Sequence, residues 1–332
     1  MIIAVDASGG DYAPYEIVKG AVKACEEYEI DIALVGKQNI LQVATRRHTK
    51  KERLTIINAS QVISCDESPM KGVQGKPDSS IVIGVNLVKT GAASAFVSAG
   101  NTGAVLVASL LSLGRQKDIE RPAIATILDI TSSTPVLLVD SGANVDCRPI
   151  HLLQFAYLGS IYAQQILNIP SPRIGLLNNG QEEAKGNRLT IETYKLLKES
   201  ELNFIGNVEG QDLLKRVADV IVTDGFTGNI VLKTLEGLGD TFQSRLSQLG
   251  RTVTTAYHLP GRLLHNVVGL DSWARRMDFQ EYGGACLLGL NGTVIITHGR
   301  SKAKAIKNAI GLAKQTVERN VLQKINQEGV KT

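Results

Sequence analysis

Two segments of this 332-residue chain combine an apolar run, a glycine-rich turn and a helix-like stretch. They read VTDGFTGNIVLKTLEG at 222–237 and FVSAGNTGAVLVASLL at 96–111. A turn of this kind directs backbone N–H groups and the N-terminus of a helix at one point, which suits a bound anion. The pattern therefore predicts an anion site, and it leaves open whether the anion is a cofactor phosphate or a reactant.

Four more apolar runs end in turns that hold glycine together with Ser, Thr, Asn or Asp. These turns span 5–11, 139–146, 176–187 and 296–301. A single glycine turn after a strand is ordinary helix-entry chemistry. Six in one chain favour a cleft lined by backbone donors and small polar side chains, and we expect all six at one edge of a sheet.

Three reactive side chains accompany these turns, and each has an ordinary alternative. Lys185, beside Gly186, brings a flexible ammonium group within reach of an anion, unless it is a surface lysine. His298 lies in the last turn and is either a site residue or a surface or core histidine. Cys147 could attack a thioester, but a small buried thiol is the favoured interpretation.

The elements that must position these turns alternate between short Val/Ile/Leu runs and helical stretches. Apolar strands without strict alternation are typical of parallel strands that are buried on both faces. The expected strands are Ile2–Asp6, Asp31–Val35, Leu54–Ile57, Ala95–Ser98, Val136–Asp140, Arg173–Leu177, Phe204–Ile205, Asp219–Thr223 and Thr293–Thr297. The expected helices lie at about 14–27, 78–90, 102–113, 149–167, 188–199 and 228–248. This order predicts an open, mostly parallel sheet with helices on both faces.

Residues 234–281 interrupt this alternation and predict two or three amphipathic helices, with breaks near Gly250 and Pro260–Gly261. We interpret them as a helical excursion within a single catalytic domain, 1–332, and we expect the excursion to form a dimer interface. Its apolar and arginine residues also suit shallow insertion at an anionic bilayer, with an ordinary packed helix as the alternative.

Composition and missing motifs argue against several classes of protein. The net charge of +4 is too small to indicate a nucleic-acid partner, and 43% hydrophobic residues describe a globular protein. Four cysteines without CxxC spacing and histidines without metal-site spacing predict no metal and a reducing cytoplasm. A secretory signal, a membrane-spanning run, a P-loop, a GxGxxG fingerprint and a GxSxG elbow are all missing from the sequence.

Taken together, the turns and their flanks resemble the PlsX family, the phosphate acyltransferases that make acyl phosphate from acyl carrier protein and inorganic phosphate. Nine segments carry the resemblance in the family's order and spacing: 4–11, 97–104, 121–123, 139–146, 173–187, 203–210, 218–237, 282–290 and 298–299. Ser8 stands where the family usually has Met, and Arg188 stands where an acidic residue is frequent. The 240–280 stretch keeps helical character but little recognisable sequence.

The resemblance implies a Rossmann-like three-layer α/β/α fold, akin to isocitrate and isopropylmalate dehydrogenases and to phosphotransacetylases. It implies a homodimer without a cofactor, in the cytoplasm and peripherally associated with the inner face of the cell membrane. It also implies the first step of bacterial phospholipid synthesis. The acyl phosphate would pass to a PlsY-type membrane glycerol-3-phosphate acyltransferase.

For this reaction we expect phosphate to attack the thioester directly, held by positioned donors. Lys185 would anchor phosphate or stabilise the transition state with support from Asn187, while Asp224 would orient donors or handle a proton and Asn229 would face the thioester. The expected phosphate and oxyanion ligands are Gly9, Gly10, Gly100, Asn101, Thr102, Gly103, Ser141, Gly142, Asn144, Thr227, Gly228 and His298.

Acyl carrier protein is acidic, so the enzyme needs a basic landing surface. Residues 45–53, 298–307, Arg275 and Arg276 are candidates for that surface, although charge runs are usually solvated faces. Two other classes of protein stay open. One is an NAD(P)-dependent dehydrogenase of the isopropylmalate type, and the other is a non-catalytic anion-binding membrane scaffold.

Overall fold

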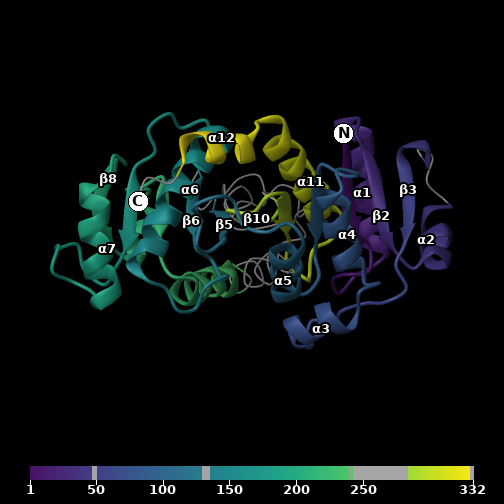
Figure 1. The fold of residues 1–332 in the computed structure, drawn as a ribbon, viewed down its shortest axis with the longest axis horizontal. Coiled ribbons are helices and arrows are strands. Elements are labelled where there is room, and N and C mark those ends of the chain that lie inside the picture. The colour runs from purple at the N-terminus through teal and green to yellow at the C-terminus, as the bar shows by residue number, and fades with distance from the viewer. Residues whose placement is uncertain (47–50, 129–134, 240, 242–282, 330–332) are drawn as a thin grey trace, which may run out of the picture.

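A computed structural model describes residues 1–46, 51–128, 135–239, 241 and 283–329. They form an α/β fold around an 11-stranded sheet of order β3-β2-β1-β4-β11-β10-β5-β6-β9-β7-β8 (Figure 1). The strands are β1 Ile2–Asp6, β2 Asp31–Gly36, β3 Leu54–Asn58, β4 Ala95–Ser98, β5 Ala123–Leu128, β6 Val136–Val139, β7 Ile174–Leu177, β8 Phe204–Val208, β9 Val220–Val222, β10 Ala285–Leu288 and β11 Thr293–Ile296.

Helices flank the sheet on both faces. They are α1 Tyr15–Tyr28, α2 Gln38–Thr45, α3 Pro69–Gly75, α4 Ser80–Lys89, α5 Thr102–Ser112, α6 Pro149–Leu167, α7 Arg188–Glu199, α11 Ala303–Glu318 and α12 Val321–Glu328. A further helix begins at residue 225 and is described to 239. Short 3₁₀ turns occur at Lys51–Arg53 and Gly210–Leu214.

Alternation along each strand divides the core between the two faces of the sheet. Ile3 and Val5 of β1 join the cluster under α1, α6 and α11, whereas Ala4 joins Phe96 in the cluster under α4 and α5. Gly84 of α4 permits close packing there, because a Cβ atom would lie 2.1 Å from the Phe96 ring. Burying a phenylalanine side chain of this kind contributes about 2–3 kcal/mol.

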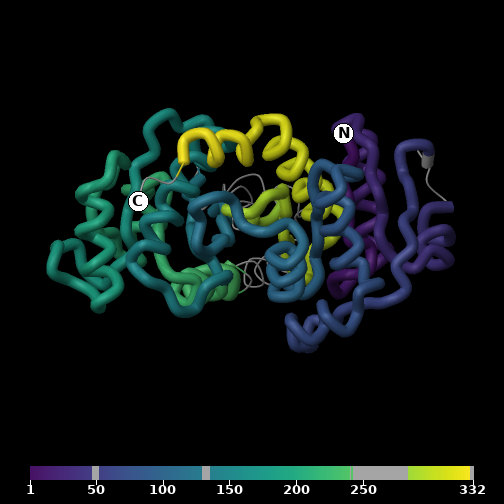
Figure 2. The backbone as a smooth tube through the Cα atoms, viewed as in Figure 1, coloured from purple at the N-terminus to yellow at the C-terminus, as the bar shows by residue number. Residues whose placement is uncertain are grey.

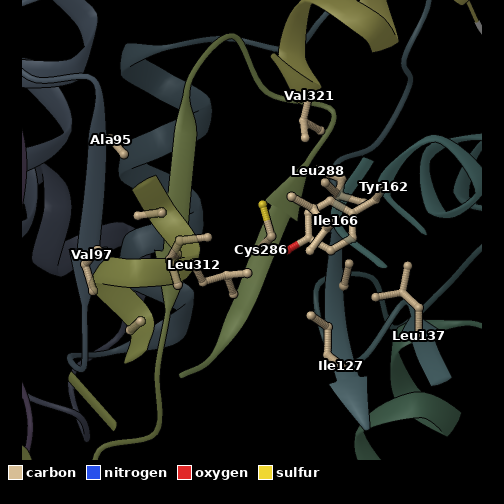
Figure 3. Packing of buried hydrophobic residues seen from close by; sticks show 14 of the residues in the cluster. Ala95, Val97, Ile127, Leu137, Tyr162, Ile166, Cys286, Leu288, Leu312 and Val321 are labelled. Carbon is tan, nitrogen blue, oxygen red and sulfur yellow. The ribbon is translucent and has the colours of Figure 1, made fainter. Parts of the chain in front are cut away.

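The central strand β10 contacts the largest buried helix of the fold. Cys286 and Leu288 of β10 lie against Tyr162 and Ile166 of α6, within the same apolar cluster (Figure 3). The C-terminal helices then return along the molecule, since α11 contacts α1 and α12 contacts α6. In Figure 2 these helices, in yellow, reach from the purple N-terminal part of the chain to its teal middle part.

Strand direction divides the sheet into two halves. Strands β1, β2, β3, β4 and β11 are parallel to one another, as are β6, β7, β8 and β9. Between them lie the antiparallel pairs β11–β10, β10–β5 and β5–β6, so the two halves run in opposite directions along the sheet. The expectation that all six turns share one edge of a parallel sheet is therefore wrong. Side-chain contacts, together with the accumulated strand twist, decide which turns meet.

The predicted elements are confirmed with small shifts at their ends, and four helices and two strands were missed. Helices α2, α3, α11 and α12 and the antiparallel strands β5 and β10 have no counterpart in the prediction. The helix expected at 228–248 begins at 225, because Asp224 caps it. Residues 242–281 of the expected excursion lie outside the described residues, so the excursion and the single-domain assignment stay predictions.

None of the helices in the described part of the chain has the length and the apolar character needed to cross a bilayer.

Candidate active site

The turns after β1 and β4 are tied together by a buried carboxylate. Asp6 Oδ1 accepts hydrogen bonds from the backbone N–H groups of Ser8 and Gly9, both at 3.0 Å, and its Oδ2 accepts one from Ser98 Oγ at 2.7 Å. Burial raises the pKa of Asp6, and these hydrogen bonds oppose that shift. The predicted residue Gly9 leaves no room for a side chain, because a Cβ atom would lie 2.8 Å from the backbone N of Gly100.

Asn101 holds the turn after β4 through its side chain. Its Oδ1 caps α5 by accepting from the Ala104 N–H at 3.0 Å, and its Nδ2 donates to the carbonyl oxygens of Ser64 at 3.0 Å and Glu67 at 3.1 Å. The amide is therefore occupied by the protein itself. The N–H groups of Thr102 and Gly103 have no acceptor among the described residues, and they lie at the N-terminus of a helix with an uncharged cap.

A second buried carboxylate organises the turn after β6. Asp140 Oδ1 accepts from the N–H groups of Gly142 at 3.1 Å and Ala143 at 3.0 Å, and its Oδ2 accepts from the backbone and side-chain nitrogens of Asn144 at 2.8 and 2.9 Å. Burial raises the pKa of Asp140. Ser141 turns away from the turn, because its Oγ bonds Thr126 Oγ at 2.6 Å.

The helix that follows β9 begins directly against this turn. The N–H of Gly225 donates to the Asn144 carbonyl at 2.7 Å, and a Cβ atom at Gly228 would lie only 1.9 Å from the Asp140 carbonyl oxygen. A Cβ atom at Gly142 would lie 3.7 Å from the Asn229 side chain. The turns after β6 and β9 therefore form one unit.

Asp224 caps that helix with its charged group. Its Oδ1 accepts from the Thr227 N–H and its Oδ2 from Thr227 Oγ1, both at 2.8 Å. A carboxylate at this place already compensates the positive end of the helix dipole. Of the two helix N-termini, that of α5 is therefore the better place for an additional anion.

His298 connects the two groups of turns. Its Nε2 lies 3.8 Å from Glu236 Oε2 on the helix after β9, and its Nδ1 accepts from the Arg300 N–H at 3.1 Å. The same turn reaches the β1 turn, since the Asp11 N–H donates to the Gly299 carbonyl at 2.8 Å and Gly10 packs on that carbonyl. Burial lowers the pKa of His298, and the Glu236 carboxylate opposes this shift.

Neither Lys185 nor Asn187 has a described contact with the turns discussed above. Asn187 caps α7 by accepting from the Thr190 N–H at 3.0 Å, and the Lys185 carbonyl accepts from Asn178 Nδ2 at 3.0 Å. Asn207 Nδ2 donates to the Glu182 carbonyl at 2.8 Å, which ties the turn to β8. The Lys185 side chain is exposed, and no described residue pairs with its ammonium group.

Cys147 is a poor candidate for a nucleophile. Its Sγ lies 3.6 Å from the Asn144 carbonyl oxygen. Burial, reinforced by the negative field of Asp140, raises the pKa of this thiol to about 12. A thiolate, which is the nucleophilic form, is therefore scarce near neutral pH.

In the ranges that the structure describes, no three His, Cys, Asp or Glu side chains group around one point. These ranges therefore contain no set of side chains that could bind a metal ion.

Sequence reasoning missed the residues that build the turns. Asp6 and Asp140 were absent from the predicted site, although each follows Val at the end of a strand, and that shared Val-Asp pair is a readable signal. Glu236 was missed as well, because its neighbour His298 comes from a distant segment. The assembled turns supply backbone N–H donors, and their carboxylates already accept hydrogen bonds from the protein. This arrangement suits the binding of an anion and of a second oxyanion that develops beside it during a reaction.

Known proteins that resemble this chain along its length are phosphate acyltransferases. Residues 1–324 match a family described as fatty acid synthesis protein. A phosphate acyltransferase from Dehalococcoides mccartyi is 55% identical over 332 residues, which are 100% of this chain and 95% of that protein. A phosphate acyltransferase from Thermoanaerobacterium thermosaccharolyticum is 49% identical over 330 residues, covering 99% of this chain and 96% of that protein.

Solved structures share the fold. A phosphotransacetylase from Streptococcus pyogenes superposes with a TM-score of 0.61 at 19% identity, over 96% of this chain and 94% of that one. This likeness agrees with a Rossmann-like α/β/α architecture.

Proposed function

The chain belongs to the fatty acid synthesis protein family, and from that premise we propose that it is a phosphate acyltransferase, which transfers an acyl group from a thioester to inorganic phosphate. The observation that carries the proposal is the 55% identity to a phosphate acyltransferase along the whole chain. The N–H groups of Thr102 and Gly103, which have no acceptor among the described residues, support it, because they offer phosphate a preformed place at the start of α5.

We further propose that the acyl donor is acyl carrier protein and that the product is acyl phosphate for the first step of bacterial phospholipid synthesis. The resemblance to the PlsX family supports this, as it does a homodimer, a cytoplasmic location at the inner face of the membrane and a PlsY-type acyltransferase as the next enzyme. The basic segment 298–307 begins at the site, which favours it as the landing surface for an acidic carrier.

In the proposed mechanism a phosphate oxygen attacks the thioester carbon. The new C–O bond forms first and turns the thioester carbonyl into a tetrahedral oxyanion. Its collapse breaks the C–S bond, and the pantetheine sulfur leaves as a thiolate that takes up a proton. Phosphate is already nucleophilic near neutral pH, so the protein positions it and stabilises the tetrahedral oxyanion with fixed donors. No covalent enzyme intermediate is needed, which is consistent with the high pKa of Cys147.

The geometry refines the predicted roles of the site residues. Asn101, Asn144 and Thr227 use their side chains to hold the turns, so we propose that their loops bind through backbone N–H groups, those of Thr102 and Gly103 first. Lys185 keeps its proposed role as a cation that reaches the anion, since its ammonium group has no described partner.

The deciding experiment mixes the purified full-length chain with acyl carrier protein thioester and inorganic phosphate, and traps acyl phosphate with hydroxylamine. Phosphate-dependent hydroxamate, released together with stoichiometric free carrier thiol, is the expected result. Hydroxamate that does not increase with phosphate above the direct reaction of hydroxylamine with the thioester would reject the proposal. A change in nicotinamide absorbance with a hydroxy-acid substrate would favour the dehydrogenase, and anion binding without turnover would favour the scaffold.

A further inference from the structure

Arg121 is an exposed cation held beside the turn after β6. Its guanidinium has no hydrogen bond or ion pair to any residue that the structure describes, although Arg148 nearby is paired with Glu120. The charge of Arg121 nevertheless reaches this turn, because it opposes the raised pKa of Cys147 and adds to the lowering of the His151 pKa.

The backbone on both sides of Arg121 is immobilised by buried side chains. Gln154 Oε1 accepts from the Glu120 N–H at 2.9 Å, and His151 Nε2 lies 3.0 Å from Glu120 Oε2. On the other side, Asn144 Nδ2 donates to the Pro122 carbonyl at 2.7 Å. A surface arginine needs no such support, whereas an arginine that binds a ligand benefits from a backbone that is held in place.

The charge around this turn calls for a cation. Asp140, Asp146 and Asp224 lie in the turns after β6 and β9, and Arg148, the one cation of segments 139–148 and 223–229, is already paired with Glu120. A phosphate group placed among these carboxylates would be repelled unless a positive charge faced it. Among the described residues that border the two turns, Arg121 is the cation left unpaired.

We propose that Arg121 binds a phosphate group of a substrate at this turn, either inorganic phosphate or the phosphodiester in the pantetheine arm of the acyl donor. A guanidinium fork binds two phosphate oxygens at once, and an ammonium group does not. The inference rests on the proposed function, and it adds a residue that recognises one of the two substrates.

The test compares Arg121→Gln and Arg121→Lys with the unchanged enzyme, and uses Lys195→Gln as a control for the loss of one surface charge. Lys195, on α7, is also exposed and without a described side-chain partner. Steady-state kinetics are measured with phosphate and with acyl carrier protein thioester varied separately. A thermal shift with inorganic phosphate alone provides a readout that does not depend on turnover.

We expect Arg121→Gln to raise one KM roughly tenfold to a hundredfold, with Arg121→Lys intermediate and Lys195→Gln unchanged. A rise in the phosphate KM, with loss of the phosphate-induced thermal shift, assigns Arg121 to inorganic phosphate. A rise in the KM of the donor alone assigns it to the phosphodiester.

Unchanged KM values in both folded variants would overturn the inference while leaving the proposed function intact. If the unchanged enzyme makes no acyl phosphate, the proposed function fails, and the thermal shift alone then decides on Arg121. In that case a phosphate-induced shift in the unchanged protein that is lost in Arg121→Gln supports the inference, and an equal shift in both, or none in either, rejects it.

Discussion

His298 Nε2 lies 3.8 Å from Glu236 Oε2, so the turn after β11 faces the helix that follows β9. These two elements belong to halves of the sheet that run in opposite directions. The contact therefore brings the turns of β1, β4 and β11 to those of β6 and β9.

The charge of Glu236 should be measurable in the titration of His298. Burial lowers the imidazole pKa and the carboxylate opposes it, so Glu236→Gln should lower the pKa of His298 further. NMR titration of the imidazole ring protons tests this. Glu318→Gln, on the remote helix α11, should leave the His298 pKa unchanged; an unchanged or higher pKa in Glu236→Gln would show that the two groups do not interact.

Lys185→Ala should lower kcat/KM roughly tenfold to a hundredfold without lowering Tm, because the side chain is exposed and its ammonium group has no described partner. Steady-state kinetics with varied phosphate measure kcat/KM, and a thermal melt measures Tm. The matched control is Lys195→Ala on the exposed face of α7, which should behave as the unchanged enzyme. Full turnover with a normal phosphate KM in Lys185→Ala would remove this lysine from the site.

Much of the architecture was readable from the sequence, because buried parallel strands are continuous apolar runs. Strands β1 and β4 were predicted within a residue for this reason. Strand β10 was missed because its place depends on antiparallel pairing with β5, such as Cys286 with Ala125. A pairing between segments so far apart leaves no periodic signal in either one.

The site was predicted less completely, for a related reason. Glycine, asparagine and threonine marked turns at strand ends, but the sequence could not tell that the Asn101 amide would be occupied by carbonyl groups of Ser64 and Glu67. Arg121 is brought to Asn144 by a fold-dependent contact through Pro122. Local spacing identifies turns, whereas the partners of each side chain depend on tertiary structure.

Stability should fall in acid because of His151, which is buried with only 5% of its side chain exposed. Its Nδ1 accepts from the Arg148 N–H at 3.1 Å, and protonation would remove that acceptor. Burial lowers the His151 pKa, so the unfolded chain binds the proton more readily. This contribution is complete above the ordinary pKa of about 6.5 and is lost as the pH falls towards the lower folded-state value.

Denaturant unfolding at pH 7.5 and at pH 5 measures this effect. The unchanged protein should be more stable than His151→Gln by about 1–3 kcal/mol at the higher pH, and the difference should shrink at the lower pH. Comparison of the two proteins cancels the contributions of the buried carboxylates Asp6 and Asp140. A difference that stays constant or grows on acidification would contradict the assignment of a neutral His151.

Two glycines of one helix should respond oppositely to alanine. A Cβ atom at Gly228 would lie 1.9 Å from the Asp140 carbonyl oxygen, which is backbone and cannot move aside, whereas at Gly237 no atom of a described residue lies within 4 Å. Gly228→Ala should therefore separate the turns after β6 and β9, lower Tm and reduce kcat/KM at least tenfold. Gly237→Ala should keep activity and gain up to about 1 kcal/mol from its better helix propensity. Thermal melts and steady-state kinetics on both variants test this pair of predictions. Normal activity in a folded Gly228→Ala protein would mean that the close contact between these turns is not required for catalysis.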